Sequence, residues 1–323
     1  PGSSVDRLRD TPPTMPEHPP SAPAGPTPGA AARSGAGAGG AIARMLGASI
    51  LFTGMALCVV RAHAHQPGLS TLAVSFVRSL VNLVALGILV RGDRRMLLGD
   101  ARPALVARGV FGALALGGYF ASLERLSAGE AAFLNQTSAG WVALLAPVVL
   151  RERTGTTGWI AVGGSLLGVL LLAHPRGGHD DTLGRALGLG SGLAAAVAYL
   201  SIRRATQTNG PIAVVGWFTL VSTLLSGPAL WLAGGDGPAD PVSLAWLVGA
   251  GLCATWAQIL MTRAYADGRA ALVAAAGASS PMLTALAGWV WLGQHPDAAG
   301  ALGMVVLFAC GVVLPWWEDR RAR

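Results

Sequence analysis

One charged residue stands well inside an apolar segment of the sequence. Arg78 lies in the run 69–90, which is long enough to cross a membrane. A charge at that depth costs about 2.5–3.5 kcal/mol on insertion scales, so proteins usually keep it against a wet cavity or a partner. A guanidinium group matches the geometry of a carboxylate or a phosphate. Arg78 is therefore expected either to bind an anionic group of a ligand or to snorkel outward as a structural residue.

Other polar and aromatic side chains interrupt the apolar runs and could line a cavity with Arg78. Asn135 and Gln136 sit in the run 128–150, where amide groups need hydrogen-bond partners. They either bond neighbouring helices or line the cavity. Aromatic walls with a few polar groups suit a small amphipathic solute. The candidate substrate-binding residues are Arg78, Tyr119, Asn135, Gln136, Tyr199, Trp256 and Gln258.

Carboxylates are missing from the middle of every apolar run. Glu124 and Glu130 come closest, near the ends of the third and fourth runs, where they are either solvated loop charges or an outer gate with Arg125. Proton-coupled carriers commonly use carboxylates inside the bilayer. The sequence therefore favours facilitated transport or exchange over a proton relay. Arg108 lies close to the end of its run, and we expect it to snorkel to the interface.

The sequence carries no pattern typical of a catalytic or cofactor site. Cys58, Cys253 and Cys310 all fall inside apolar runs and lack the spacing of a metal site. We find no phosphate-binding loop and no Ser-His-Asp arrangement, so we expect neither a cofactor, a metal nor an enzyme. An integral-membrane enzyme would need a cluster of His, Asp or Glu near one interface. A non-transporting scaffold would need interaction domains.

Ten apolar segments must position the candidate residues. The chain is 52% hydrophobic and 12% charged, with a mean hydropathy of +0.53, which is too apolar for a soluble domain. Each segment is near the length of about 20 residues that a helix needs to cross the hydrocarbon. The sequence thus predicts an all-α polytopic membrane protein with ten transmembrane helices. The expected spans are 42–60, 69–90, 104–122, 128–150, 157–174, 183–202, 211–233, 243–262, 270–292 and 298–317.

Arginine placement predicts how these helices are oriented. All 23 basic residues are arginines, and basic residues concentrate in the cytoplasmic loops of membrane proteins. With the N-terminus inside, 17 arginines fall in cytoplasmic segments and four in outside loops. This ratio predicts an inner-membrane protein with both termini cytoplasmic, and it explains the basic charge without nucleic acid. Residues 1–40, rich in Pro, Ala, Gly and Ser, are expected to form a disordered cytoplasmic tail, and 318–323 a short one.

The sequence divides into two similar halves. The segment 138–150 lies over 280–292 without a gap, and each is followed by a polar turn. An odd number of spans in each half places the halves in opposite senses across the membrane, as in many secondary transporters. We therefore predict a 5+5 inverted repeat, with its first copy over 41–174 and its second over 183–317.

Glycines recur at four-residue spacing in the fifth and sixth segments. Gly164 and Gly168 lie in the fifth, and Gly184, Gly188 and Gly192 in the sixth. Such spacing lets helix backbones approach closely in a membrane. We expect these glycines to pack the two helices, and the same helices could hold the interface of a homodimer.

Short motifs after equivalent helices carry a family resemblance. They are Leu150-Arg151-Glu152-Arg153 and Leu292-Gly293-Gln294-His295, together with Phe76-Val77-Arg78-Ser79 in the second segment. On these residues the stretch 44–317 resembles the drug/metabolite transporter superfamily, specifically its ten-helix EamA-type branch. Ser280-Pro281 matches a proline that such proteins often carry early in the ninth helix. The first half departs from this pattern with Ser138-Ala139, and the second has Gln294 where Glu is common.

The resemblance implies two sets of five helices around a central cavity and transport by alternating access. We therefore expect a secondary transporter that moves a small metabolite, an amino acid or a related organic solute, with export as the expected direction. Its expected partners are the lipid bilayer, the solute and, in a homodimer, a second copy of the chain. An integral-membrane enzyme and a membrane scaffold are the alternatives.

Overall fold

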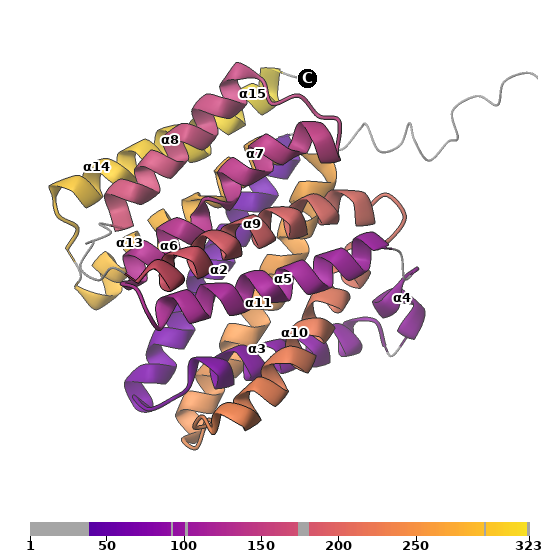
Figure 1. The fold of residues 1–323 in the computed structure, drawn as a ribbon, viewed down its shortest axis with the longest axis vertical. Helices are drawn as coiled ribbons and strands as arrows, with labels where there is room; N and C mark the ends of the chain where they lie inside the picture. Colours follow the sequence, from indigo (N-terminus) through magenta and orange to yellow (C-terminus); the bar gives the residue numbers. More distant parts are fainter. Residues whose placement is uncertain (1–38, 92, 101–102, 174–180, 294, 322–323) are drawn as a thin grey trace, which may run out of the picture. The chain divides into compact units, whose positions relative to one another are not determined.

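Ten helical spans of membrane length make up the part of the chain that the structure describes (Figure 1). The computed structural model describes residues 39–91, 93–100, 103–173, 181–293 and 295–321. The predicted N-terminal tail lies outside the described residues except for its last two positions, and so do residues 322–323. The ten spans confirm the predicted all-α membrane fold, and they alternate in direction along the chain, so five spans per half give the inverted repeat.

Most spans are single helices. They are α2 (Gly39–His65), α3 (Thr71–Leu89), α5 (Pro103–Leu123), α8 (Thr156–Ala173), α9 (Thr182–Ala205), α10 (Pro211–Ala233) and α11 (Pro241–Asp267). A short helix that the sequence did not predict, α4 (Arg94–Leu98), follows α3. Helices α2 and α11 extend several residues beyond their predicted apolar spans, because polar residues can continue a helix past the hydrocarbon.

The remaining spans are built from consecutive helical pieces. The fourth consists of α6 (Ala128–Gln136) and α7 (Ser138–Val149), and the ninth of α12 (Ala270–Gly277) and α13 (Ser279–Leu292). Each pair is interrupted at one residue, Thr137 or Ala278, and these breaks fall at nearly equivalent places in the two repeats. The tenth span runs through α14 (Ala298–Leu307), the π-helical turn η1 (Phe308–Val313) and α15 (Leu314–Arg321).

Two sides of the helix bundle are distinguished by their connections. We call the "α15 side" the one that carries α4, α15 and the turns 150–155, 206–210 and 267–269. The "opposite side" carries the connections 66–70, 124–127 and 234–240, together with 293 and 295–297. The α15 side lies toward the top and right of Figure 1 and the opposite side toward the left and bottom. Polar residues start several helices on the opposite side, where Ser127, Asp181, Asp240 and Asp297 each accept a hydrogen bond from a backbone N–H of the first turn.

Small residues allow the helices to approach closely. Helices α2 and α11 run antiparallel along each other, and Gly54 faces Cys253 across this contact. Helices α8 and α14 meet at Gly168 and Gly303, where a Cβ on Gly168 would lie 2.6 Å from Cγ of Leu307 and 3.0 Å from the carbonyl oxygen of Gly303. In the sixth span, Gly188 and Gly192 lie against Leu134 of the fourth span, so the predicted glycines of both segments make close helix contacts within the chain.

Gly168→Ala should destabilise the protein, although alanine favours helices, because the added methyl group would overlap α14. We expect a loss of about 1–3 kcal/mol from overpacking. Gly163→Ala is the matched control, since a Cβ there meets no atom within 4 Å, and it should be neutral or stabilising by up to about 1 kcal/mol. Thermal unfolding of the two purified variants in detergent measures both effects. Equal melting temperatures would contradict the assigned α8–α14 contact.

Candidate functional site

Arg108 is buried among three helices, which corrects the expectation that it snorkels to the interface. Only 2% of the residue is exposed. Its Nη2 donates a hydrogen bond to Oε1 of Gln258 at 2.9 Å, and its guanidinium carbon lies 4.2 Å from the centre of the Phe218 ring. Gly112, one turn later in α5, makes room for this conformation, because a Cβ there would collide with Nη1 of Arg108. The side chain thus turns toward α10 and α11.

The hydrogen bonding of Arg108 is incomplete. Its Nε is buried and has no hydrogen-bond partner within the described residues. The contact with Phe218 is a cation–π interaction, which stabilises a desolvated guanidinium without neutralising its charge. The charge therefore stays uncompensated by any described carboxylate.

Two stacked tyrosines lie beside Arg108. The rings of Tyr199 in α9 and Tyr265 in α11 have centroids 5.1 Å apart and planes 15° apart. Both are close enough to interact electrostatically with Arg108. Tyr199 was predicted from the sequence, whereas Tyr265 was missed because it lies at the polar end of a span, where a tyrosine is typically an interface anchor. In the structure Tyr265 is only 1% exposed.

Arg78 meets the same helix that holds Gln258. Its backbone carbonyl packs on α11, so that a Cβ on Gly251 would lie 3.2 Å from that oxygen. Gly251 and Gln258 are seven residues apart, which is about two turns of one helix face and about 10 Å along its axis. Arg78 is partly buried, and its Nη1 lies 3.9 Å from the weakly accepting Sδ of Met55. Helix α11 therefore connects the surroundings of Arg78 and Arg108.

The other predicted residues are not gathered around Arg108. Asn135 donates a hydrogen bond to Oγ of Ser191 at 3.0 Å, so its amide joins α6 to α9. Gln136, the last residue of α6, and Tyr119 in α5 are both partly buried. Trp256 is 52% exposed and lies on a different face of α11 from Gln258, because residues two apart in a helix point in nearly opposite directions.

Carboxylates are placed only at the ends of the spans. Within the ten spans they are Glu130, Asp267 and Glu318. They form ion pairs with Arg185, Arg44 and Arg269, respectively. Across the part of the chain that the structure describes, neither Arg78 nor Arg108 has such a partner.

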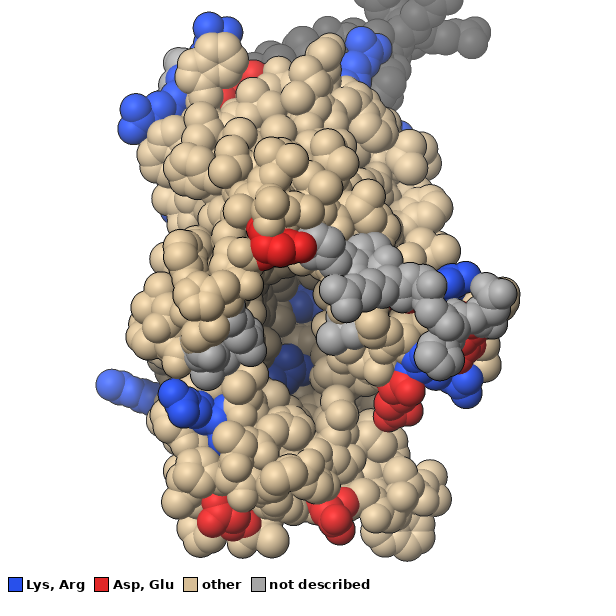
Figure 2. All heavy atoms as spheres, turned by 90° about the vertical axis from the view of Figure 1, so that its left-hand side faces the viewer, with Lys and Arg blue, Asp and Glu red and all other residues tan. Residues whose placement is uncertain are grey.

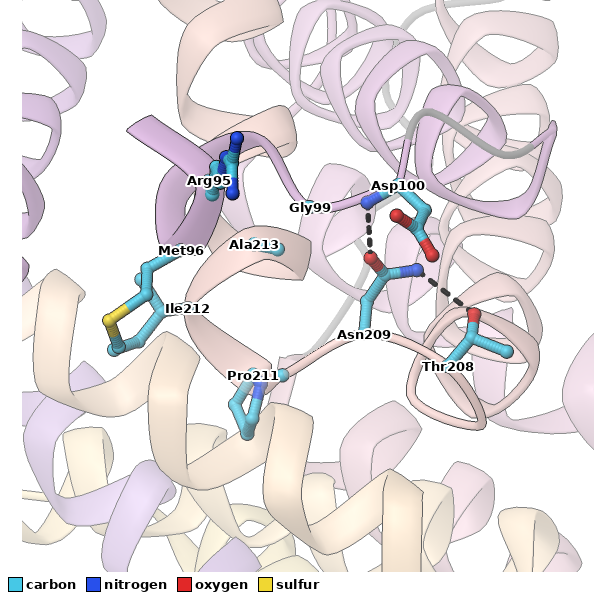
Figure 3. Close-up of a pocket in the computed structure, with 10 residues that line it drawn as sticks. Arg95, Met96, Gly99, Asp100, Thr208, Asn209, Pro211, Ile212 and Ala213 are labelled. Atoms are coloured by element: carbon cyan, nitrogen blue, oxygen red, sulfur yellow. Dashed lines mark hydrogen bonds between the residues drawn. The ribbon is translucent and has the colours of Figure 1, made fainter. Parts of the chain in front are cut away.

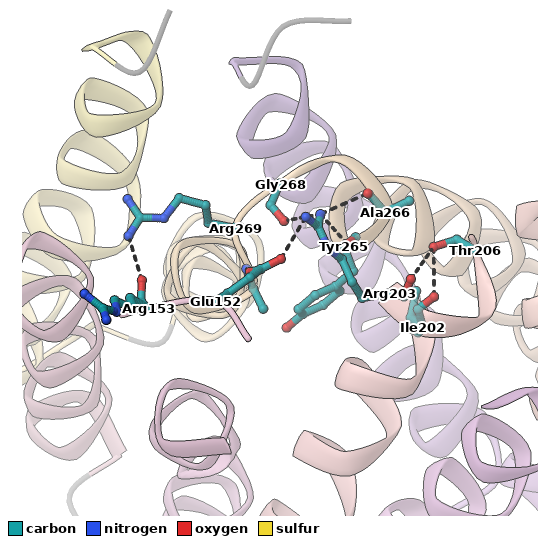
Figure 4. Close-up of polar contacts among 10 residues, drawn as sticks. Glu152, Arg153, Ile202, Arg203, Thr206, Tyr265, Ala266, Gly268 and Arg269 are labelled. Carbon is teal, nitrogen blue, oxygen red and sulfur yellow. Dashed lines mark hydrogen bonds and ion pairs between the residues drawn. The ribbon is translucent and has the colours of Figure 1, made fainter. Parts of the chain in front are cut away.

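Charged residues join the two repeats on the α15 side (Figure 4). Glu152, in the turn after α7, forms an ion pair with Arg203 of α9 at 2.8 Å. The Nη1 of Arg203 also donates to the carbonyls of Ala266 at 2.9 Å and Gly268 at 2.7 Å. Arg203 thus ties the first repeat to two helices of the second. The turn at Glu152, which carries one of the motifs of the family resemblance, thus holds the two halves together.

Further contacts extend this connection toward the C-terminus. Arg269 forms an ion pair with Glu318 at 3.2 Å and donates to the backbone carbonyl of Arg153 at 3.2 Å. Glu152 accepts a hydrogen bond from the backbone N–H of Ala270 at 3.3 Å. We call the set Glu152, Arg153, Arg203, Gly268 and Arg269 the "α15-side network".

The opposite side is hollowed (Figure 2). Basic atoms are visible in the depth of the hollow, and an acidic side chain lies at its rim.

Two ion pairs lie on the opposite side. Arg125 pairs with Asp181 at 3.2 Å, and Arg185 with Glu130 at 2.9 Å. The hydrogen bond from the Gly184 N–H and the proximity of Arg125 lower the pKa of the Asp181 carboxyl group. These charges therefore join α9 to the first repeat. Arg125, which the sequence offered as a gate partner of Glu130, pairs with Asp181 instead.

Two other cavities lie away from the arginines inside the spans. One of about 650 Å³ is formed on the α15 side by α4 and the turn before α10 (Figure 3). There Oδ1 of Asn209 accepts a hydrogen bond from the Asp100 N–H at 2.8 Å, and its Nδ2 donates to Thr208 at 3.1 Å. The polar groups of this cavity thus bond one another at helix ends. A second cavity of about 440 Å³ lies between α2 and α13 and is mostly apolar.

No group of three or more His, Cys, Asp or Glu residues is arranged to hold a metal ion among the residues that the structure describes.

Comparisons with known proteins match both halves of the fold. The model of the EamA-like transporter family matches residues 40–173 and again 182–314. The chain belongs to the EamA-like transporter family. The two matches coincide with the two sets of five spans, and this EamA protein is accordingly a multi-pass membrane transporter of small metabolites, in contact with the lipid bilayer and its solute.

Relatives of this EamA protein are named as transporters. It is 28% identical over 266 residues to the pseudopaline exporter CntI of Pseudomonas aeruginosa, covering 81% of the chain and 92% of that relative. It is 29% identical over 220 residues to a riboflavin transporter of Rhizobium johnstonii, covering 68% of the chain and 72% of the relative. A solved crystal structure shares the fold, with a TM-score of 0.73 at 19% identity over 87% of this chain and 98% of the other.

Gln258→Leu should destabilise the EamA protein by about 1–3 kcal/mol, because it removes a side-chain partner of a buried guanidinium. Thr262→Val in the same helix is the matched control. Its hydroxyl is buried without a described partner, so the isosteric change should cost little. Thermal unfolding in detergent compares the variants. A melting temperature of Gln258→Leu equal to that of Thr262→Val would contradict the role given to the Arg108–Gln258 bond.

Proposed function

We propose that this protein exports a small organic metabolite by alternating access, and that the structure represents an outward-open conformation. The observation that carries this proposal is the contrast between the two sides. One side is hollowed between the helices, although two ion pairs join α9 to the first repeat there. On the other side the α15-side network ties the first repeat to both α9 and α11. A carrier with one accessible side and one closed side has the asymmetry that alternating access requires.

The α15 side is proposed to face the cytoplasm of an inner membrane. It carries the arginine-rich connections near α4, the turn 150–155 and α15, and basic residues concentrate on the cytoplasmic side. Both chain ends would then be cytoplasmic. The hollow would open to the outside, where an exporter releases its cargo.

Export of a small organic solute is supported by the relatives. One is named an exporter of pseudopaline and another a transporter of riboflavin. The lack of a carboxylate in the middle of any span supports facilitated transport or exchange rather than a proton relay through the bilayer. Opening toward the cytoplasm would require the bond between Glu152 and Arg203 to break.

Removing the Glu152 charge should make the α15 side open more often. We expect Glu152→Gln to increase labelling of a cysteine placed at Ala205, which is 1% exposed and lies two residues after Arg203. Labelling with a membrane-impermeant maleimide in inside-out vesicles, in a background without the native cysteines, measures this opening. An increase of several-fold is expected, because an ion pair with supporting hydrogen bonds is worth about 1–2 kcal/mol when partly buried.

Arg153→Gln is the matched control, because this side chain in the same turn is exposed and only its backbone enters the network. It should leave labelling at residue 205 unchanged. Combining Glu152→Gln with Arg203→Gln tests the pair directly, since the two effects should not add if the residues act through one bond. Equal labelling in all variants would contradict the closure assigned to the network.

A further inference from the structure

Two arginines inside the membrane region have no carboxylate partner among the residues that the structure describes. Arg78 and Arg108 are the arginines of the spans that contact α11 away from the α15-side network. Five other described arginines, Arg44, Arg125, Arg185, Arg203 and Arg269, have carboxylate partners. A charge in a region of low dielectric constant is costly unless it is paired or hydrated. The two unpaired arginines therefore need an anion or water.

Arg108 needs a counter-charge more than Arg78 does, because it is the more deeply buried of the two. It is buried, and its Nε–H has no hydrogen-bond partner within the described part of the chain. Its described contacts, Gln258 and Phe218, are neutral. A neutral amide and an aromatic face orient the guanidinium group but do not neutralise its positive charge. This is the arrangement expected of a group that waits for an oxyanion rather than one that holds helices together.

Arg78 belongs to the neighbouring helix α3. Its backbone carbonyl packs on α11 two turns, about 10 Å along the axis, from Gln258, the residue that holds Arg108. Its guanidinium group lies against Met55 of α2. The nearby Tyr199 and Tyr265 rings and Phe218 supply aromatic surface. The hollow of the opposite side shows basic atoms in its depth, which gives an anion a route toward positive charge.

We propose that the substrate is an organic anion, a carboxylate or phosphate attached to an apolar or aromatic body, and that Arg108 and Arg78 bind its charged groups. This assignment rests on the proposed transport function. Arg108 binds the oxyanion through its guanidinium group when helix movement uncovers that group, which is 2% exposed here, and Arg78 supplies a second positive contact from α3. A bound anion would neutralise the charge of two arginines that pair with no described carboxylate.

Ligand-dependent thermal stabilisation of the purified protein in detergent tests the charge requirement. The probes are phenylacetate against phenylacetamide for the carboxylate arm, and phenyl phosphate against phenol for the phosphate arm. We expect at least one anion to stabilise the wild-type protein at concentrations about tenfold or more below those that its neutral counterpart needs. Equal effects within both pairs, or no stabilisation by either anion, would overturn the proposal.

Variants locate the binding groups. Arg78→Gln and Arg108→Gln should each weaken binding of the stabilising anion by about tenfold or more, and Arg108→Lys should retain part of it. Arg263→Gln removes the same charge from an exposed position of α11 and should bind like the wild type. If Arg108→Gln fails to fold, the anion affinities of Arg78→Gln and Arg108→Lys still test whether the two arginines bind the anion. Unchanged binding by both would remove the arginines from the site.

Flux measurements separate this proposal from the transport function. In proteoliposomes, a neutral solute carried with saturable kinetics that Arg78→Gln and Arg108→Lys leave unchanged would overturn the anionic class and leave the carrier intact. We expect instead that saturable flux is found for the stabilising anion and is lowered in both variants.

Discussion

A positive charge inside a membrane protein must be paired, hydrated or bound to a ligand, and this constraint organises the molecule. Arginines near the ends of the spans meet carboxylates or backbone carbonyls, and these bonds fix how the helix ends pack. The arginines deeper in the spans lack carboxylates within the described residues. The same residue type therefore ties the two repeats together at one side of the bundle and places positive charge without a described carboxylate partner between the helices.

Helix α11 connects these two roles. Along one flank it packs on α2, with Gly54 facing Cys253, and on α3 at Gly251. Farther along, Gln258 holds Arg108, and the carbonyls after Tyr265 accept hydrogen bonds from Arg203. A change at the α15-side network would thus act on the helix that also positions the arginine site. Because the α15-side network and the proposed arginine site both contact α11, a movement of this one helix would couple breaking of the network to substrate binding.

The fold could be predicted from the sequence because its signals are local. Apolar runs, arginine-rich connections and the match of 138–150 to 280–292 require no knowledge of neighbours. The site was harder to predict, since burial depends on how each helix is rotated toward its partners. Arg108 was misjudged because its position near a span end suggested snorkelling, and Glu152 and Arg203 meet across separate repeats. The separation of Trp256 from Gln258 was predictable, because residues two apart cannot share a helix face.

The central claim is that the two repeats face opposite ways, with the α15 side in the cytoplasm. Cysteines substituted for Arg153 and His295, one after each equivalent helix, test it most directly in a protein free of native cysteines. Labelling with an impermeant maleimide in intact cells and in inside-out vesicles is the measurement. We predict that residue 153 reacts only in inside-out vesicles and residue 295 only in intact cells. Reaction of both residues from the same side, or with the sides exchanged, would contradict the account.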